Sequence, residues 1–218
     1  MKDSLKQVRL SVDEFNANGF FVLADVIDEE TRTRLIAELP PIEESGTRTL
    51  LENQAFAELA RGLRNSESLN KTLAGLSAVQ CTYFRKTPEH NWAVRLHRDL
   101  VIPVNGSGPW KSAGKKEGLS TVSADVEFLN RCVGVRVHLD GAPSGDINVV
   151  PGSHRDRSEP DATQAVAVPV ERLGALVMKP TLLHGSSKLA QSAGQRRVLH
   201  YLFAPAALPG NFSWHVSV

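Results

Sequence analysis

The stretch Val133-Gly134-Val135-Arg136-Val137-His138-Leu139 alternates apolar side chains with small or polar ones. A period of two is typical of a β-strand that has one face in an apolar core. The valines and Leu139 therefore point to one side, and Arg136 and His138 share the other. This stretch predicts a strand that packs on apolar neighbours with one face and carries polar side chains on the opposite face.

Similar short β-rich runs follow one another from residue 77 to residue 203. Turn sequences such as Asn105-Gly106, Pro143-Ser144-Gly145 and Pro151-Gly152 separate them. Several short strands at this spacing favour an antiparallel sandwich or barrel. The expected strands are 79–84, 100–104, 133–139, 147–150, 165–170, 175–178 and 198–203.

Residues 1–76 have a different pattern, which predicts a mostly helical flank. Ser11-Val12-Asp13-Glu14 has the residues of a capping box and should start a first helix. The apolar run 20–23 predicts a short strand, and a second helix should open at Asp28 and end before Pro40. Helical periodicity returns in patches later in this flank. The remaining residues, 77–218, would then form the β-rich core.

The composition is that of an ordinary globular chain, with 218 residues, 41% hydrophobic, 22% charged and a formal net charge of +1. This length suits one domain covering residues 1–218. Interspersed charges argue against a nucleic-acid partner, and the absence of a long apolar run argues against a membrane partner. The N-terminus has no signal-peptide pattern, and Cys81 and Cys132 lie in apolar surroundings typical of buried thiols. We therefore expect a cytoplasmic protein, and no sequence feature specifies its oligomeric state.

Residues 105–131 interrupt the β-rich pattern, because the part from Asn105 to Gly118 is polar and rich in glycine. A loop of this length inside a compact domain is usually functional or disordered. Two interpretations remain equal at this point: a mobile surface loop, or a lid that closes over an active site.

Two His-x-Asp tripeptides, His97-Arg98-Asp99 and His138-Leu139-Asp140, offer an imidazole and a carboxylate on one face of an extended segment. Non-haem iron(II) oxygenases use two imidazoles and one carboxylate and leave the other metal positions open. Chance alone predicts about 0.3 such tripeptides at this composition, so each one singly is a weak signal. The second copy lies within the alternating strand, where a histidine that lines a barrel and an aspartate that caps a turn are the simpler interpretation.

His184 is the best candidate for the second imidazole, because it follows an apolar run and precedes an arginine-led strand. A guanidinium there can hold a dicarboxylate with two parallel hydrogen bonds. Both Arg196 and Arg197 lead that strand. From the residues alone, a metal triad of His97, Asp99 and His184 and a set of scattered structural histidines remain open alternatives.

Three blocks of sequence resemble the phytanoyl-CoA dioxygenase family. The first is Phe84–Trp92 leading into His97–Asp99, the second is the Pro-Gly-Ser-His turn within Val149–Arg155, and the third is His184–Ser187 followed by the two arginines. Together with the helix–strand–helix opening, they span nearly the whole chain. Each block alone is unspecific, but the combination is specific.

The resemblance implies a double-stranded β-helix (a jelly-roll, cupin-like core) with flanking helices, and an enzyme that uses iron(II), 2-oxoglutarate and O2. It implies that His97, Asp99 and His184 are the iron ligands. Arg196 and Ser186 match the residues that bind the far carboxylate of 2-oxoglutarate. The spacing to the arginine is one residue longer than usual, so Arg197 is an alternative to Arg196. Arg136 matches a position near the co-substrate.

The implied activity is a dioxygenase that hydroxylates or otherwise oxidises an unactivated C–H bond of a small polar metabolite or natural-product intermediate and releases succinate and CO2. The carboxylate of Asp99 favours such oxidation over chlorination, because halogenating family members lack it. Gln80, Trp110 and His138 are candidates for the substrate pocket, although each is equally consistent with an ordinary structural role. The alternatives are a cupin-like metal protein with a non-oxidative role, such as an isomerase, and a non-catalytic binding module.

Overall fold

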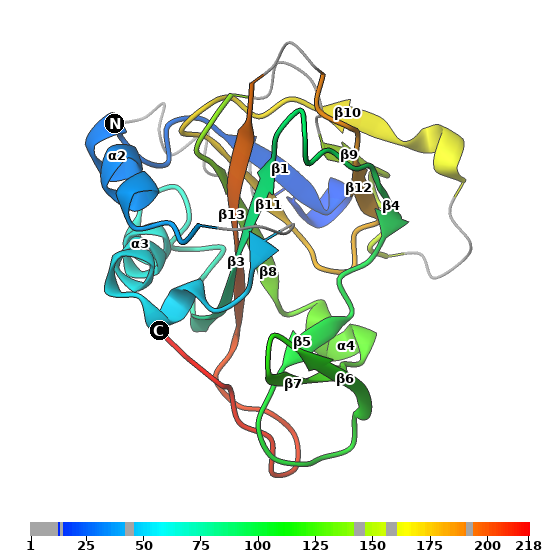
Figure 1. Ribbon diagram of the computed structural model, residues 1–218. Coiled ribbons are helices and arrows are strands. Elements are labelled where there is room, and N and C mark those ends of the chain that lie inside the picture. The colour runs from blue at the N-terminus through cyan, green and yellow to red at the C-terminus, as the bar shows by residue number, and fades with distance from the viewer. Residues whose placement is uncertain (1–12, 14, 42–45, 142–146, 156–160, 191–193) are drawn as a thin grey trace.

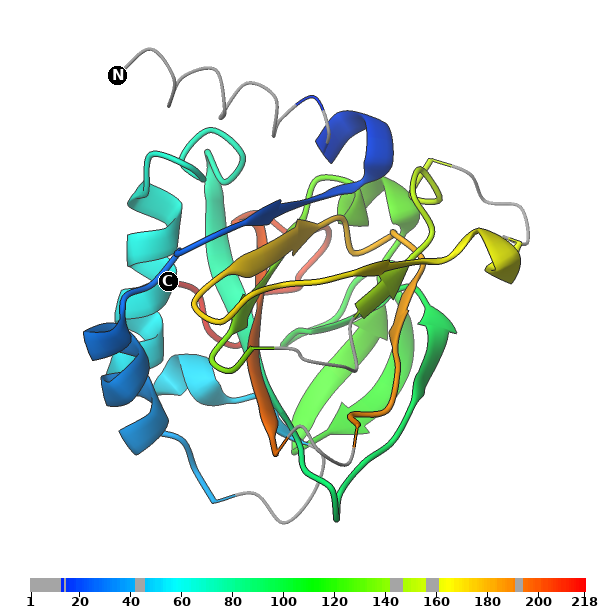
Figure 2. The same cartoon turned by 90° about the horizontal axis from the view of Figure 1, so that it is seen from above.

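The protein is mainly β, with helices on one side (Figure 1). The computed structural model describes residues 13, 15–41, 46–141, 147–155, 161–190 and 194–218. Two antiparallel sheets face each other, and a third, smaller sheet extends from one end of them (Figures 1 and 2). The mainly β jelly-roll class expected from the sequence is confirmed.

The strands fall into three sheets, in each of which the order of the strands follows their hydrogen bonding. The six-stranded sheet contains β1 (Phe20–Leu23), β11 (Ala175–Met178), β8 (Val133–His138), β13 (Arg196–Pro205), β3 (Leu76–Lys86) and β2 (Gly46–Thr47). The four-stranded sheet contains β10 (Val166–Val168), β9 (Ile147–Val149), β12 (His184–Ser186) and β4 (Val94–His97). The three-stranded sheet contains β5 (Val101–Pro103), β7 (Leu119–Ser123) and β6 (Lys111–Lys116).

Two helices cover the outer face of the six-stranded sheet, α2 (Glu29–Ala37) and α3 (Gln54–Asn65) (Figure 1). Asp28 caps α2 by accepting a hydrogen bond of 2.8 Å from the Thr31 amide, which satisfies one of the free donors of the first turn. Residues 15–18 are also helical, as the sequence predicts, and the remaining helical segments are η1 (Leu50–Glu52), α4 (Val126–Leu129) and η2 (Ala162–Gln164). No helix among the described residues has the length and apolarity that crossing a membrane requires.

The largest apolar core lies between these helices and the six-stranded sheet. The odd-numbered residues of β8 and β13 face the helices, so Val135 and Leu199 lie in the same cluster as Phe56 and Leu63 of α3. The Tyr201 hydroxyl donates a hydrogen bond to a backbone carbonyl of α3, which satisfies a buried polar atom. The even-numbered residues of the two strands face the space between the sheets, as the alternation of residues 133–139 predicts.

A tight turn ties the N-terminal segment to the β-core. The Gly152 amide donates to the Asn18 carbonyl at 2.8 Å, within the Pro-Gly-Ser-His turn. Gly19 has a φ of +84°, and a Cβ there would clash with Nδ1 of His154. Only glycine fits this position without strain, so His154 serves to pack the turn against β1.

The segment 105–131 is not a loop throughout, contrary to the expectation from its glycine content. Its central part forms the hairpin β6–β7, which pairs with β5, and its last part forms α4. The side chain of Glu117 at the hairpin tip accepts hydrogen bonds from Thr47 and Arg48. The period-two signal was hidden because β6, Lys-Ser-Ala-Gly-Lys-Lys, is exposed along its whole length.

The other sequence expectations have mixed outcomes. Each expected strand has a counterpart within a few residues, and the cysteines are buried and free. The strands β4 and β12 were not predicted, because three or four residues show no periodicity. Ser11, Val12 and Glu14 of the expected capping box, and the turn at 143–145, lie outside the described residues.

We expect that Leu199→Ala lowers the free energy of unfolding by about 2–5 kcal/mol, because it removes a fully buried side chain from the central strand β13. Urea denaturation followed by circular dichroism measures the change. Val166→Ala is the control: Val166 is 44% exposed on β10, so its substitution should change stability by less than about 0.5 kcal/mol. An equal loss in both variants would contradict the placement of the core.

Candidate metal centre

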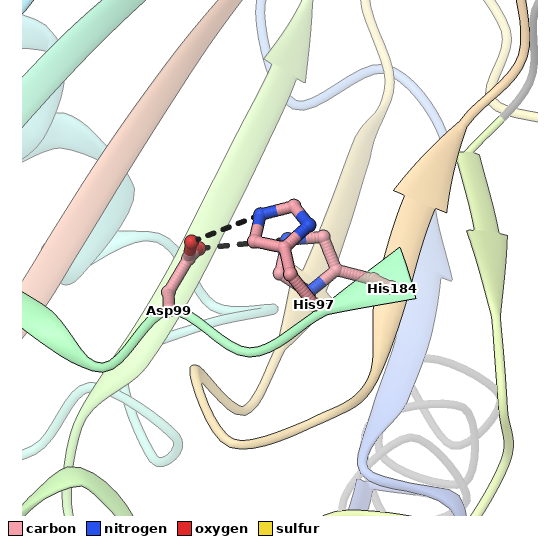
Figure 3. Close-up of side chains that lie close together, drawn as sticks. All are labelled: His97, Asp99 and His184. Carbon is pink, nitrogen blue, oxygen red and sulfur yellow. Dashed lines mark ion pairs between the residues drawn. The ribbon is translucent and has the colours of Figure 1, made fainter. Parts of the chain in front are cut away.

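The pairing of β4 with β12 brings two histidines face to face. His97 at the end of β4 is the direct cross-strand partner of His184 at the start of β12, and their ring centroids lie 4.4 Å apart. Gly185 permits this approach, because a Cβ there would lie 2.5 Å from the Val94 carbonyl oxygen. Two imidazoles that are 87 residues apart in the chain therefore meet at the edge of the four-stranded sheet (Figure 3).

The Asp99 carboxylate completes the group two residues after His97. Its amide donates a 2.9 Å hydrogen bond to the Pro180 carbonyl, which holds this segment against the turn before β12. Asp99 Oδ1 lies 3.4 Å from His97 Nε2, and Oδ2 lies 3.5 Å from His184 Nε2 (Figure 3). Ligand atoms that share one ion at bonds of about 2.1 Å lie roughly 3 Å apart, so one ion fits between these three groups.

Each imidazole is oriented for metal binding by a contact with the backbone carbonyl two residues before it. Nδ1 of His97 is 2.9 Å from the Arg95 carbonyl, and Nδ1 of His184 is 2.9 Å from the Leu182 carbonyl. A carbonyl can only accept, so Nδ1 carries the proton in each ring. The free electron pair then lies on Nε2, the atom that faces Asp99.

The charges of the site suit a cation. Burial would raise the pKa of Asp99, but the neighbouring His184, His97 and His200 hold this pKa well below its usual value, so the carboxylate is ionised. The imidazolium form of His97 would donate a hydrogen bond to Asp99, which raises the pKa of His97, whereas burial lowers the pKa of His184. The arrangement of two imidazoles and one carboxylate on one side of an ion leaves the remaining coordination positions open.

The other histidines and the second tripeptide do not join this centre. His200 Nε2 is 4.0 Å from Asp99 Oδ2, and burial lowers its pKa to about 4, so its ring is neutral. Asp140 instead forms ion pairs with Arg32 and Arg197 at 3.1 and 2.8 Å. Within the described part of the chain, one group of His, Cys, Asp or Glu side chains can hold a metal ion, namely His97, Asp99 and His184.

A cavity of about 320 Å³ opens beside the centre, between the two sheets. At its far end Arg196 is the cross-strand partner of Lys86, and both side chains are buried. Lys86 Nζ donates a 2.9 Å hydrogen bond to Ser186 Oγ. Arg196, Ser186 and Arg136 all line this cavity, whereas Arg197 points to the other face of β13, where it pairs with Asp140.

The candidates for the substrate pocket have different positions. Gln80 lines the cavity and donates to Thr82 at 2.7 Å. Trp110 does not line it: its indole N–H donates to Asp125 at 2.8 Å, and its ring stacks on Phe212 at the base of the hairpin. His138 is 1% exposed and is not among the residues that line the cavity.

Lys86 is a further basic residue of the cavity, and its position in β3 places it there. It follows Phe84 by two residues, and both side chains line the cavity. Burial, reinforced by Arg196 and Arg136, lowers the pKa of Lys86 to about 7. Lysine is common on surfaces, so nothing in its local sequence marks it as buried.

Comparisons of the sequence with family models and with curated proteins give no match. The resemblance to the phytanoyl-CoA dioxygenase family therefore stays a prediction.

Solved structures with the same fold are numerous. HygX from Streptomyces hygroscopicus, solved with nickel, 2-oxoglutarate and hygromycin B, has a TM-score of 0.65 at 17% identity, over 92% of this chain and 88% of that one. SnoK, a non-heme alpha-ketoglutarate-dependent carbocyclase from nogalamycin biosynthesis, has a TM-score of 0.68 at 16% identity, over 91% and 84%. AviO1 from Streptomyces viridochromogenes Tue57 has a TM-score of 0.61 at 21% identity, over 93% and 97%. At these identities the likeness shows a shared fold.

We expect His97→Ala and His184→Ala each to weaken the binding of a divalent ion such as nickel(II) by more than about 100-fold. Loss of a group that only hydrogen-bonds to a metal ligand already costs about 10–100-fold in affinity, and loss of the ligand itself should cost more. Calorimetric titration of the metal-free protein measures the affinity. His215→Ala is the control, since His215 is not part of the metal group and its ring pairs with Glu52. Unchanged metal affinity in His97→Ala would contradict the assignment of this centre.

Proposed function

We propose that this chain is a non-haem iron(II) oxygenase that uses 2-oxoglutarate and O2 to oxidise a small polar molecule. The observation that supports it best is the combination of two features in one cavity. The group of His97, Asp99 and His184 lies on its wall, and a buried arginine, lysine and serine lie together farther inside. A metal centre and a dicarboxylate anchor are the two parts that this chemistry needs.

The three ligands supply the metal half of the proposal. His97 and His184 would give one imidazole nitrogen each, and Asp99 one carboxylate oxygen. Iron(II) bound there, together with 2-oxoglutarate, supplies O2 activation coupled to release of succinate and CO2 and to oxidation of a substrate C–H bond. The protein itself orients the reactants and keeps bulk water from the site.

Arg196, Lys86 and Ser186 supply the co-substrate half. The carboxylate at the far end of 2-oxoglutarate would accept hydrogen bonds from the Arg196 guanidinium and from Ser186, and Lys86 adds a second cation beside them. A planar guanidinium matches a carboxylate with two parallel hydrogen bonds. Removing both cations from water is costly, and a bound dianion offsets this cost.

The solved structures of the same fold agree with this class but leave the reaction type open. One is described as a carbocyclase and another, SnoN, as an epimerase, both alpha-ketoglutarate-dependent. Hydroxylation or another oxidation of a C–H bond, rather than chlorination, is the outcome we propose, because Asp99 supplies the carboxylate ligand. A cupin-like metal protein with non-oxidative chemistry would need the metal ligands but not the cationic group at the far end of the cavity.

We expect the anaerobic protein with iron(II) to develop a visible charge-transfer band when 2-oxoglutarate is added. Arg196→Met should raise the dissociation constant of 2-oxoglutarate by about 10–100-fold, because it removes a charge-assisted hydrogen-bonded pair. Titration followed by absorbance measures both, and O2-dependent succinate release in the presence of a metabolite extract tests turnover.

Arg197→Met is the matched control for this titration. Arg197 is the next residue of the same strand, but its guanidinium pairs with Asp140 on the opposite face. It should lower stability and leave the 2-oxoglutarate affinity near that of the wild type. A wild-type protein that binds iron(II) but gives no band would favour the non-oxidative alternative.

The affinity for 2-oxoglutarate should fall as pH rises above 7. The pKa of Lys86 is lowered to about 7 in the free protein, and a carboxylate beside it raises that pKa. Binding above pH 7 therefore takes up a proton, and the dissociation constant should rise by up to about tenfold per pH unit between about pH 7 and 8.5. Below pH 7 Lys86 is already charged and this dependence should vanish.

Calorimetry of the nickel(II)-loaded protein at several pH values measures this effect. Lys86→Met should bind 2-oxoglutarate more weakly and should lose the dependence seen above pH 7. The same slope in wild type and variant would mean that another group is responsible.

A further inference from the structure

The wall of the cavity is strongly cationic. Asp99, a proposed metal ligand, is the one acidic residue among the described residues that line it. The basic residues that line it are Arg48, Lys86, Arg98, Lys116, Arg136 and Arg196. This excess of positive charge is larger than a single carboxylate of a co-substrate would neutralise.

Two of the six cations have structural partners. The Arg48 guanidinium forms an ion pair of 2.7 Å with Glu117 at the tip of the β6–β7 hairpin. Arg98 donates to the carbonyl oxygens of Thr181 and Ser153 at 3.0 and 3.2 Å, which ties β4 to the turns beside it. Neither charge is directed to a ligand by its contacts.

Two further cations belong to the proposed co-substrate site. Lys86 and Arg196 lie side by side on neighbouring strands, together with Ser186. Lys116, by contrast, is exposed on the hairpin at the cavity mouth. Its charge can attract an anion from solution but is too hydrated to fix one.

Arg136 differs from the other five. Its residue is 8% exposed and its Nε is buried without a partner. Across the described residues, its guanidinium has no hydrogen bond or ion pair, and it contacts the Phe84 ring, whose centroid lies 5.3 Å from Cζ. A buried charge without a partner is costly unless a ligand compensates for it.

The position of Arg136 associates it with the metal end of the cavity. Its cross-strand partner on β13 is His200, whose ring approaches Asp99 to 4.0 Å. Arg196 is four residues away along β13, which corresponds to about 13 Å of strand. The backbone of Arg136 is thus level with the metal ligands. Its guanidinium, whose pKa is lowered by burial and by Arg196 and raised by Asp99, lies between those ligands and the co-substrate anchor.

We propose that Arg136 binds an anionic group of the primary substrate, a carboxylate or a phosphate, beside the metal. This inference rests on the proposed function, since it assigns the substrate class of that same cavity, and it replaces the co-substrate position that the family resemblance implies for Arg136. Iron(II), Asp99 and doubly charged 2-oxoglutarate sum to a charge of −1. Lys86, Arg196 and Arg136 add +3, so the filled site still carries excess positive charge that an anionic substrate neutralises.

The size of the cavity limits the substrate as well. Pockets for drug-sized ligands span roughly 300–1,000 Å³, and this cavity, at about 320 Å³, must also hold the metal and the co-substrate. A small substrate with one anionic group fits these limits. A polycationic substrate does not, because it would meet Lys116 at the mouth and Arg136 inside.

The test compares three small probes of similar shape and different charge: glycerol 2-phosphate, glycerol and 2-amino-1,3-propanediol. Each is titrated calorimetrically into the nickel(II)- and 2-oxoglutarate-loaded protein and into the metal-free protein. The phosphate should bind the loaded protein at least about tenfold more tightly than glycerol, and the amine more weakly than glycerol. Arg136→Met should remove the preference for phosphate, and Arg136→Lys should restore part of it.

Arg61→Met is the control, because Arg61 is exposed on α3 and does not line the cavity. Equal affinity for the three probes, or a phosphate affinity that Arg136→Met does not lower, overturns the proposal. If Arg136→Met raises the dissociation constant of 2-oxoglutarate as strongly as that of the phosphate, the guanidinium serves the co-substrate, and the proposal is wrong. A wild-type protein without the iron–2-oxoglutarate band contradicts the proposed function, while an Arg136-dependent phosphate affinity in the metal-free protein would still support the anion site.

Discussion

The close contact between β4 and β12 is the constraint on which the metal centre depends. Gly185 allows the backbone of β12 to lie against the Val94 carbonyl, and this fixes the register in which His97 faces His184. Two backbone carbonyls then set the orientation of both rings. The donors are thus arranged by main-chain geometry, which costs little to maintain when a metal is absent.

The alternation of strand residues separates stability from chemistry. One face of β8 and β13 packs on the helices, where Val135, Leu199 and Phe203 are fully buried. The other face of the same strands carries Arg136 and His200 into the cavity. Substitutions on one face therefore act mainly on folding, and substitutions on the other act mainly on ligand binding.

The cavity holds its cations at a cost in folding free energy. Burial lowers the pKa of Lys86 to about 7 and that of Arg136 to about 9, because this environment disfavours their charged forms. Anionic ligands that bind the folded chain and not the unfolded one recover this cost as stability. The apolar core behind the sheet provides the stability that tolerates such a site.

The sequence by itself determined the local features. Period-two alternation over residues 133–139 predicted the strand and the shared face of Arg136 and His138, and the apolar runs predicted the β-rich core. The family-like blocks also indicated the three metal ligands, because a His-x-Asp tripeptide places two of them on one face. These features depend on neighbours in the chain, which a sequence displays directly.

Only the tertiary structure decided what depends on distant neighbours. It distinguished Arg196 from Arg197, because adjacent strand residues point to opposite faces and the register with β3 sets which one enters the cavity. It also assigned Asp140 to an ion pair, folded the glycine-rich segment into a hairpin, and buried Lys86 beside Ser186. Each outcome follows from long-range pairing and burial, and these are not encoded in the identity of any single residue.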